Sequence, residues 1–188
     1  MNARLNARSN VSWLLASCIL FAASPAIGQE GPVLKEGQAD VNTLVDALSP
    51  PEPVRTRSIR IARGDVGSPA VAPTPPKVSL LITFDTNSAH LTAGARRALD
   101  VVGQALASDK LAGARFAIEG HADPRGLSET NLKLSQSRAQ SVRNYLVDTM
   151  RIDRTRLDAV GKGDRELMNK ANPDAPENRR VTIVNLSH

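Results

Sequence analysis

Asp123 and Arg138 are the two residues of this sequence whose types and spacing best suit binding chemistry. Asp123 lies in a loop bracketed by Gly120 and Gly126, and Pro124 restricts the backbone of that loop. Arg138 follows fifteen residues later, on a segment whose apolar pattern predicts an amphipathic helix. A carboxylate accepts hydrogen bonds from an ammonium, and a guanidinium is a planar fork that matches a carboxylate. The pair therefore matches an amino-acid head group that carries both charges.

The same two residues also fit a plainer interpretation, in which Asp123 and Arg138 bond to each other and fix the loop on the helix. Exposed ion pairs of this kind are common and contribute about 0–1 kcal/mol to stability. Spacing alone leaves both the binding site and the structural salt bridge open.

A catalytic interpretation has less support than either of these. His121, Asp123 and Ser128 could belong to a hydrolase, but no glycine-flanked nucleophile motif surrounds Ser128. His90 lies in another loop and His188 is the last residue, so the sequence contains no His or Cys cluster with the spacing of a zinc site. We therefore expect a protein that is not an enzyme and that needs no metal and no cofactor.

The elements that position Asp123 and Arg138 are predicted from apolar periodicity over residues 78–188. Thr92 suits the cap of a helix in which apolar residues recur up to Leu106, and a second helix is expected from Ser128 to about Val147. Strands are expected at 78–84, 115–119, 157–160 and 181–186. This order predicts an α/β fold, an α+β sandwich of βαβαβ-β topology with two helices packed on one face of a mixed sheet.

The first 28 residues have the pattern of an export signal. Arg4 and Arg8 precede an apolar run from Val11 to Ala23, and small residues follow before a cut expected ahead of Gln29. Cys18 offers an alternative, since Leu15-Ala16-Ser17-Cys18 resembles the lipobox of bacterial lipoproteins, in which the cysteine is lipidated. Simple cleavage is the preferred interpretation, because the whole run fits the usual apolar region of about 7–15 residues.

Residues 29–77 are predicted to form a proline-rich, disordered tether. Seven of the twelve prolines lie between Pro50 and Pro76, which rules out a regular helix or a central strand there. The segment 40–48 has the spacing of a short amphipathic helix, too short to be stable unless it docks on something. Four arginines at positions 55–63 could attract an anionic partner, but a solvated linker is the preferred interpretation.

The overall charge gives little support for nucleic-acid binding. Lys and Arg total 24 against 19 Asp and Glu, and aromatic residues make up only 3% of the chain. A small, dispersed positive charge with few stacking platforms is not typical of a nucleic-acid-binding protein. Cys18 is the single cysteine, so no internal disulfide stabilises the domain.

Several motifs resemble those of OmpA-like peptidoglycan-binding domains. Gly120-His121-Ala122-Asp123, followed by the run from Asn131 to Val142, is similar to the signature of that family. The version with Arg125-Gly126 after the acid is most similar to that of peptidoglycan-associated lipoproteins. Phe84-Asp85-Thr86-Asn87 and Asn178-Arg179-Arg180-Val181 agree in order, so the resemblance extends over about residues 78–186.

The resemblance implies non-covalent binding of peptidoglycan through the meso-diaminopimelate of its stem peptide. Carried over to this sequence, Asp123 would hold the ammonium and Arg138 the carboxylate. Asn131 and Asn87 would form secondary hydrogen bonds, and Leu134 would line the floor of the site. Arg179 and Arg180 are interpreted as structural, bracing the last loop.

The resemblance also implies a place in the cell. A chain of this kind would lie in the periplasm of a Gram-negative cell envelope, associated with the outer membrane, and would tether the envelope to the wall. The alternative is an envelope adaptor, in which the tether docks on an outer-membrane or other envelope protein while the domain anchors that protein to the wall.

Overall fold

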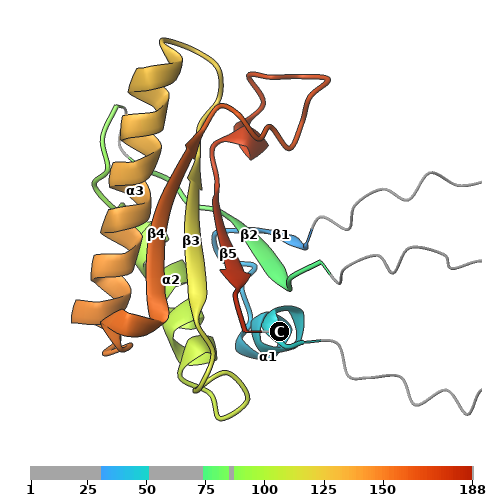
Figure 1. The fold of residues 1–188 in the computed structure, drawn as a ribbon, viewed down its shortest axis with the longest axis vertical. Helices are drawn as coiled ribbons and strands as arrows, with labels where there is room; N and C mark the ends of the chain where they lie inside the picture. Colours follow the sequence, from blue (N-terminus) through green and yellow to red (C-terminus); the bar gives the residue numbers. More distant parts are fainter. Residues whose placement is uncertain (1–30, 51–73, 85–86, 188) are drawn as a thin grey trace, which may run out of the picture.

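A five-stranded mixed sheet in the order β1-β2-β5-β3-β4 forms the framework of the computed structural model, which describes residues 31–50, 74–84 and 87–187. In chain order the elements are β1 (Val33–Lys35), α1 (Val41–Leu48), β2 (Lys77–Leu81), α2 (Ala93–Leu106), β3 (Phe116–His121), α3 (Ser128–Asp148), η1 (Arg154–Arg156), β4 (Leu157–Gly163), η2 (Pro176–Asn178) and β5 (Val181–Asn185). The predicted α/β class with a mixed sheet is confirmed (Figure 1).

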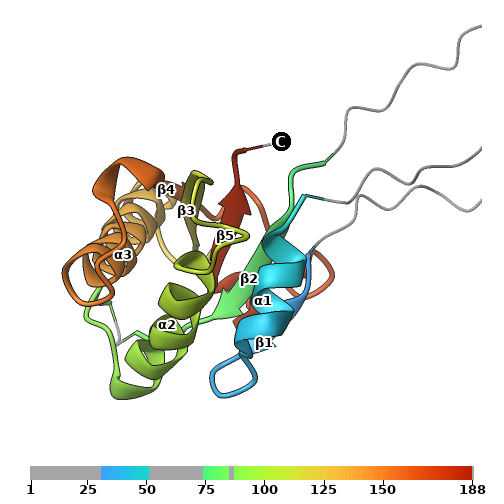
Figure 2. The ribbon, with the colours of Figure 1, turned by 90° about the horizontal axis from the view of Figure 1, so that it is seen from below.

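The last strand lies inside the sheet rather than at its edge. β5 pairs antiparallel with both β2 and β3, while β3 and β4 pair in parallel through the crossover helix α3. The helices cover one face of the sheet (Figure 2). Because β5 lies beside β3, the segment that enters β5 comes next to the loop that leaves β3, and these two segments hold the charged residues described below.

The core lies between the helices and the sheet. Thr92 caps α2 as predicted, its hydroxyl accepting a hydrogen bond from the backbone N–H of Ala95. The apolar stripes of α2 and α3 are fully buried: Ala95, Leu99, Val102, Leu106, Ala139, Val142 and Leu146. Polar residues of α3, among them Asn131 and Arg138, lie outside this apolar stripe.

Residues 33–48, which were predicted as part of the tether, belong to the folded unit instead. β1 adds a parallel strand to β2. The short helix expected at 40–48 is present as α1, and it packs on the sheet as a third helix beside the two expected there. Asp40 caps α1, and Leu44 and Leu48 are fully buried in the core. Docking of this apolar face supplies the stability that a helix of eight residues lacks alone.

Close contact between α3 and the sheet depends on glycines. A Cβ at Gly120 would collide with the backbone oxygen of Ser135, and one at Gly161 would collide with the backbone of Gln136. Both glycines lie inside strands, whereas the sequence suggested that Gly120 ends one strand and Gly161 closes the next. The missing side chains let α3 approach β3 and β4, which fixes the helix against the end of β3.

Three sequence predictions lie wholly or partly outside the described residues. The export signal at 1–28, including Cys18, and the arginines of the segment 51–73 fall there, as do Asp85 and Thr86. None of the helices within the described ranges is long and apolar enough to cross a membrane.

Candidate ligand-binding pocket

A cavity of about 830 Å³ opens where four segments of the chain meet. These are the end of β2 with the residues after it, the loop between β3 and α3, the first half of α3, and the segment that leads into β5. The five residues predicted as a site all line this cavity: Asn87, Asp123, Asn131, Leu134 and Arg138. The fold therefore brings together residues that are up to 51 positions apart, from Asn87 to Arg138.

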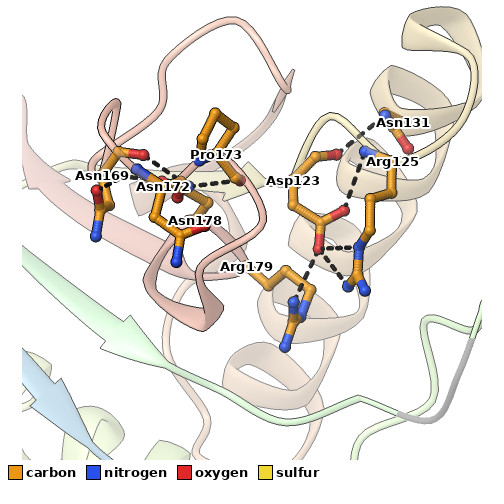
Figure 3. Close-up of polar contacts among 8 residues, drawn as sticks. All are labelled: Asp123, Arg125, Asn131, Asn169, Asn172, Pro173, Asn178 and Arg179. Carbon is orange, nitrogen blue, oxygen red and sulfur yellow. Dashed lines mark hydrogen bonds and ion pairs between the residues drawn. The ribbon is translucent and has the colours of Figure 1, made fainter.

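Asp123 supplies a buried carboxylate that is already paired within the protein. Its residue is 6% exposed, and its Oδ2 accepts hydrogen bonds from Nε and Nη2 of Arg125 at 3.2 and 2.7 Å and from Nη1 of Arg179 at 2.8 Å (Figure 3). Oδ1 accepts from the backbone N–H of Arg125 at 3.3 Å. Burial raises the pKa of Asp123, but the bonds from Arg125 and Arg179 outweigh it and hold the pKa below its ordinary value.

Arg138 supplies a half-buried guanidinium on the wall formed by α3. Its Nε donates to the backbone oxygen of Ser88 at 3.0 Å, and the guanidinium carbon lies 4.9 Å from the centre of the Phe84 ring. Burial lowers the pKa of Arg138, the positive charge of Arg179 lowers it further, and Asp123 opposes both. Within the part of the chain that the structure describes, no hydrogen bond or ion pair engages the two terminal Nη atoms of Arg138.

Asp123 and Arg138 do not pair with each other in the described part of the structure. The structural salt bridge that spacing left open is therefore wrong: the partners of Asp123 are Arg125 and Arg179 instead. The acid and the base both line the cavity, so a ligand can contact each of them.

Asn131 holds the loop against the start of α3. Its Nδ2 donates to the backbone oxygen of Asp123 and to Oδ2 of Asp164, both at 3.1 Å. The hydroxyl of Ser128 donates to the other oxygen of Asp164 at 2.7 Å. Both N–H groups of the Asn131 amide are therefore engaged inside the protein, which leaves its oxygen for a ligand.

Asn87 and Leu134 also line the cavity. Asn87 is exposed and has a φ of 50°, in the left-handed region that asparagine tolerates better than most residues. Leu134 is half-buried on α3 and adds apolar surface to the lining, together with Leu81, Ile82 and Phe84. The cavity thus combines charged groups with an apolar wall.

Three arginines that line the cavity were not predicted as site residues: Arg125, Arg179 and Arg180. Arg125 was seen only as part of a motif, and Arg179 was interpreted as a structural brace. Arg179 follows Asn178, a fully buried residue whose amide donates to the backbone oxygens of Asn169, Asn172 and Pro173 (Figure 3). This network fixes the loop that precedes Arg179, whose guanidinium bonds to Asp123. The only signal for this role in the sequence is the run Asn178-Arg179-Arg180.

His121 also lines the cavity. The residue is 2% exposed. Burial, together with the charges of Arg180 and Lys162, lowers the pKa of His121 to about 3 against the opposing effect of Glu166. The imidazole is therefore neutral at physiological pH. Among the described residues, no group of three or more His, Cys, Asp or Glu side chains is placed to hold a metal ion.

Comparison with known proteins identifies relatives of this domain. A peptidoglycan-associated lipoprotein of Pseudomonas putida is 34% identical over 102 residues, which cover 53% of this chain and 59% of that protein. The chain thus spans less than two thirds of that relative. The peptidoglycan-associated lipoprotein of Brucella melitensis biotype 1 is 33% identical over 132 residues, covering 65% of this chain and 77% of that protein.

Solved structures show the same fold. The OmpA-like domain of FopA1 from Francisella tularensis superimposes with a TM-score of 0.50 at 20% identity, covering 57% of this chain and 70% of that chain. The model of the OmpA family matches residues 83–180, which include all five predicted site residues. Because this match spans more than half of the 188 residues, the chain belongs to the OmpA family.

Proposed function

We propose that this protein binds peptidoglycan non-covalently by gripping the free end of meso-diaminopimelate in the stem peptide. Asp123 accepts hydrogen bonds from the ammonium, and Arg138 donates to the adjacent carboxylate. The ligand is held by charge and hydrogen bonding, with no covalent step. The names of the Pseudomonas and Brucella relatives, both peptidoglycan-associated lipoproteins, support this assignment.

The observation that carries the proposal is the placement of one buried carboxylate and one half-buried guanidinium on the wall of the same cavity. The terminal Nη atoms of Arg138 are unengaged by described residues, while its Nε is fixed to Ser88 and its face is fixed by Phe84. A guanidinium held in this way presents a pre-oriented fork to a carboxylate.

The remaining predicted residues have supporting roles in the proposal. The Asn131 oxygen and the Asn87 amide form secondary hydrogen bonds with the ligand. Leu134, with Leu81 and Phe84, packs against the methylene groups that separate the two ends of diaminopimelate. Burial of those groups contributes about 0.8 kcal/mol for each CH₂.

Placement of the protein in the cell is part of the proposal. Export by the segment 1–28 delivers the domain to the periplasm of a Gram-negative envelope, and association with the outer membrane follows either from a partner protein or from lipid on Cys18. The proline-rich segment 51–73 then connects two parts of the folded unit, since residues 33–48 precede it.

Mass spectrometry of the mature N-terminus distinguishes a chain that begins at lipidated Cys18 from one that begins at Gln29.

The second candidate function is an envelope adaptor, in which the domain anchors a bound envelope protein to the wall. Because α1 is docked on the domain, the region available to dock such a partner is the arginine-containing segment 51–73. Pull-down from envelope extracts with and without those arginines tests this candidate separately from wall binding.

Co-sedimentation with purified peptidoglycan sacculi tests the proposed function. The chain from Gln29 to His188 retains every described residue and should pellet with sacculi. Asp123→Asn and Arg138→Gln should each lower the pelleted fraction at least tenfold, whereas Arg97→Gln, on the exposed side of α2, should not. Circular dichroism confirms that each variant is folded. Equal pelleting of all four proteins would contradict the proposal.

A further inference from the structure

Positive charge exceeds negative charge in the lining of the cavity. Four arginines line the cavity, Arg125, Arg138, Arg179 and Arg180, against a single lining residue with a carboxylate, Asp123. The neighbouring carboxylate of Asp164 is engaged by Ser128 and Asn131. A head group with one ammonium and one carboxylate has no net charge, so its entry leaves this excess of positive charge uncompensated.

Asp123 has no free position on Oδ2 for an incoming ammonium. That oxygen accepts three hydrogen bonds from two guanidinium groups, at 2.7, 2.8 and 3.2 Å. An oxygen has room for about this many donors at most. Oδ1 accepts a single hydrogen bond, at 3.3 Å, and keeps a position for another donor. An ammonium that bridges both oxygens of Asp123 can therefore reach Oδ2 only if Arg125 or Arg179 moves away.

Arg125 is the one that can leave more easily. Its side chain is 60% exposed, against 40% for Arg179, so water already solvates much of its guanidinium. Arg179 directly follows Asn178, whose fully buried amide is bonded to the backbone of the loop 169–173. The backbone N–H of Arg125 bonds to Oδ1 of Asp123 independently of the side chain, so the loop keeps its anchor when the guanidinium swings out.

We propose that Arg125 exchanges partners when the ligand binds: the ligand ammonium replaces it on Asp123, and the released guanidinium pairs with a second carboxylate of the ligand. This inference rests on the proposed function and makes it more specific. The preferred ligand is a diamino acid with one free ammonium and two free carboxylates. Converting the second carboxylate to a neutral amide weakens binding, because the ion pair with Arg125 is lost.

Asp174 is the competing destination for the released guanidinium. It is the only other acid whose charge raises the pKa of Arg125, after Asp123 itself, among the described residues. If Arg125 turned to Asp174 on ligand binding, the second carboxylate would gain no partner and its amidation would have no effect. Amidation of the second carboxylate therefore weakens binding if Arg125 pairs with the ligand, and has no effect if Arg125 pairs with Asp174.

Calorimetric titration of the Gln29 to His188 chain with two synthetic probes tests the inference. The first is meso-diaminopimelate acetylated on one nitrogen, which has one ammonium and two carboxylates. The second is the same compound with the carboxylate beside the acetylated nitrogen converted to an amide. The wild type should bind the acid about fivefold more tightly than the amide, the range expected of a half-exposed ion pair.

Arg125→Gln should bind the two probes equally within twofold, and Arg97→Gln should keep the wild-type preference. Asp174→Asn should also keep it, since Asp174 takes no part in the exchange. An equal preference in wild type and Arg125→Gln, or no preference in the wild type, would overturn the role of Arg125 while leaving sacculus binding intact. If the wild type bound neither the probes nor sacculi, both the role of Arg125 and the proposed peptidoglycan binding would be wrong.

Discussion

Arg179 donates a hydrogen bond of 2.8 Å from Nη1 to Oδ2 of Asp123, across 56 residues of sequence. The bond joins the segment before β5 to the loop after β3, and these segments meet because β5 pairs with β3 inside the sheet. It also brings the Arg179 charge close enough to lower the pKa of Arg138. The acid and the base proposed to bind the ligand are thus both influenced by this third residue.

Arg179→Gln should raise the pKa of Asp123 toward the ordinary value of an aspartate. One of the guanidinium groups that favour the ionised carboxylate is removed, while that of Arg125 remains. A carboxyl whose folded pKa is depressed adds stability at neutral pH, and this contribution is lost as pH falls through the folded pKa. We expect the variant to lose about 1 kcal/mol of unfolding free energy at pH 7 and to lose less on acidification.

The measurement is a carbon-13 NMR titration of the Asp123 carboxyl in wild type and variant. Arg97→Gln serves as the matched control and should leave the titration unchanged. An Asp123 pKa that is the same with and without Arg179 would show that the hydrogen bond has no electrostatic effect.

Gly120→Ala should destabilise the domain by about 2–3 kcal/mol, since its Cβ would meet the backbone of Ser135 and push α3 away from β3. Gly113 is the matched control, because a Cβ there would meet nothing within 4 Å. Urea unfolding of Gly113→Ala should agree with wild type within about 0.5 kcal/mol. Equal stability of the two alanine variants would mean that the helix does not depend on this close approach.

His121 should make the free energy of unfolding depend on pH from about 7 down to its folded pKa of about 3. The folded pKa is about 3 and the ordinary value is 6.5, so below pH 6.5 the unfolded chain binds a proton that the folded protein excludes. Stability is therefore lost as pH falls, by about 2 kcal/mol between pH 7.5 and pH 5. His121→Gln should remove this slope, whereas His90→Gln, at an exposed position, should retain it. The free energy of unfolding is measured in urea at several pH values for the wild type and both variants. If it fell equally with pH in all three proteins, His121 would not be the source of the pH dependence.

Leu48→Ala should lower the unfolding free energy by about 2–5 kcal/mol, the usual range for a leucine removed from a core. Leu48 is fully buried where α1 docks, although the sequence placed it in a tether. Val33→Ala, at a residue that is 40% exposed on β1, should cost much less. If Leu48→Ala unfolded with the wild-type midpoint in urea, α1 would not be part of the cooperative unit.

Much of the fold was predictable because local patterns and core packing agree. Thr92 caps α2, and the buried stripe of Ala139, Val142 and Leu146 lies where periodicity placed it. The docking of α1 was not predictable, since a helix of eight residues is decided by its tertiary contacts. The full length of β4 was also missed, because Gly161 and Gly163 normally end strands, and only contact with α3 explains them.

The five residues predicted for the candidate site line one cavity, but the hydrogen bonds and ion pairs of Asp123 were not predictable. Asp123 and Arg138 belong to one short motif, and both line the cavity. The ion pair between Asp123 and Arg179 depends on strand order, which no spacing within the motif reveals. The buried network of Asn178 that orients Arg179 likewise exists only once residues 169–178 are folded.

An NMR titration of the nitrogen-15-labelled chain from Gln29 to His188 with meso-diaminopimelate tests the central claim most directly. We predict that the side-chain Nε–H signals of Arg138 and Arg125 and the backbone amide of Asp123 shift together and saturate with one affinity. Shifts confined to the second hollow, lined by His90, Tyr145 and Asp148, would contradict the claim. So would unchanged spectra at concentrations of diaminopimelate that release the protein from sacculi.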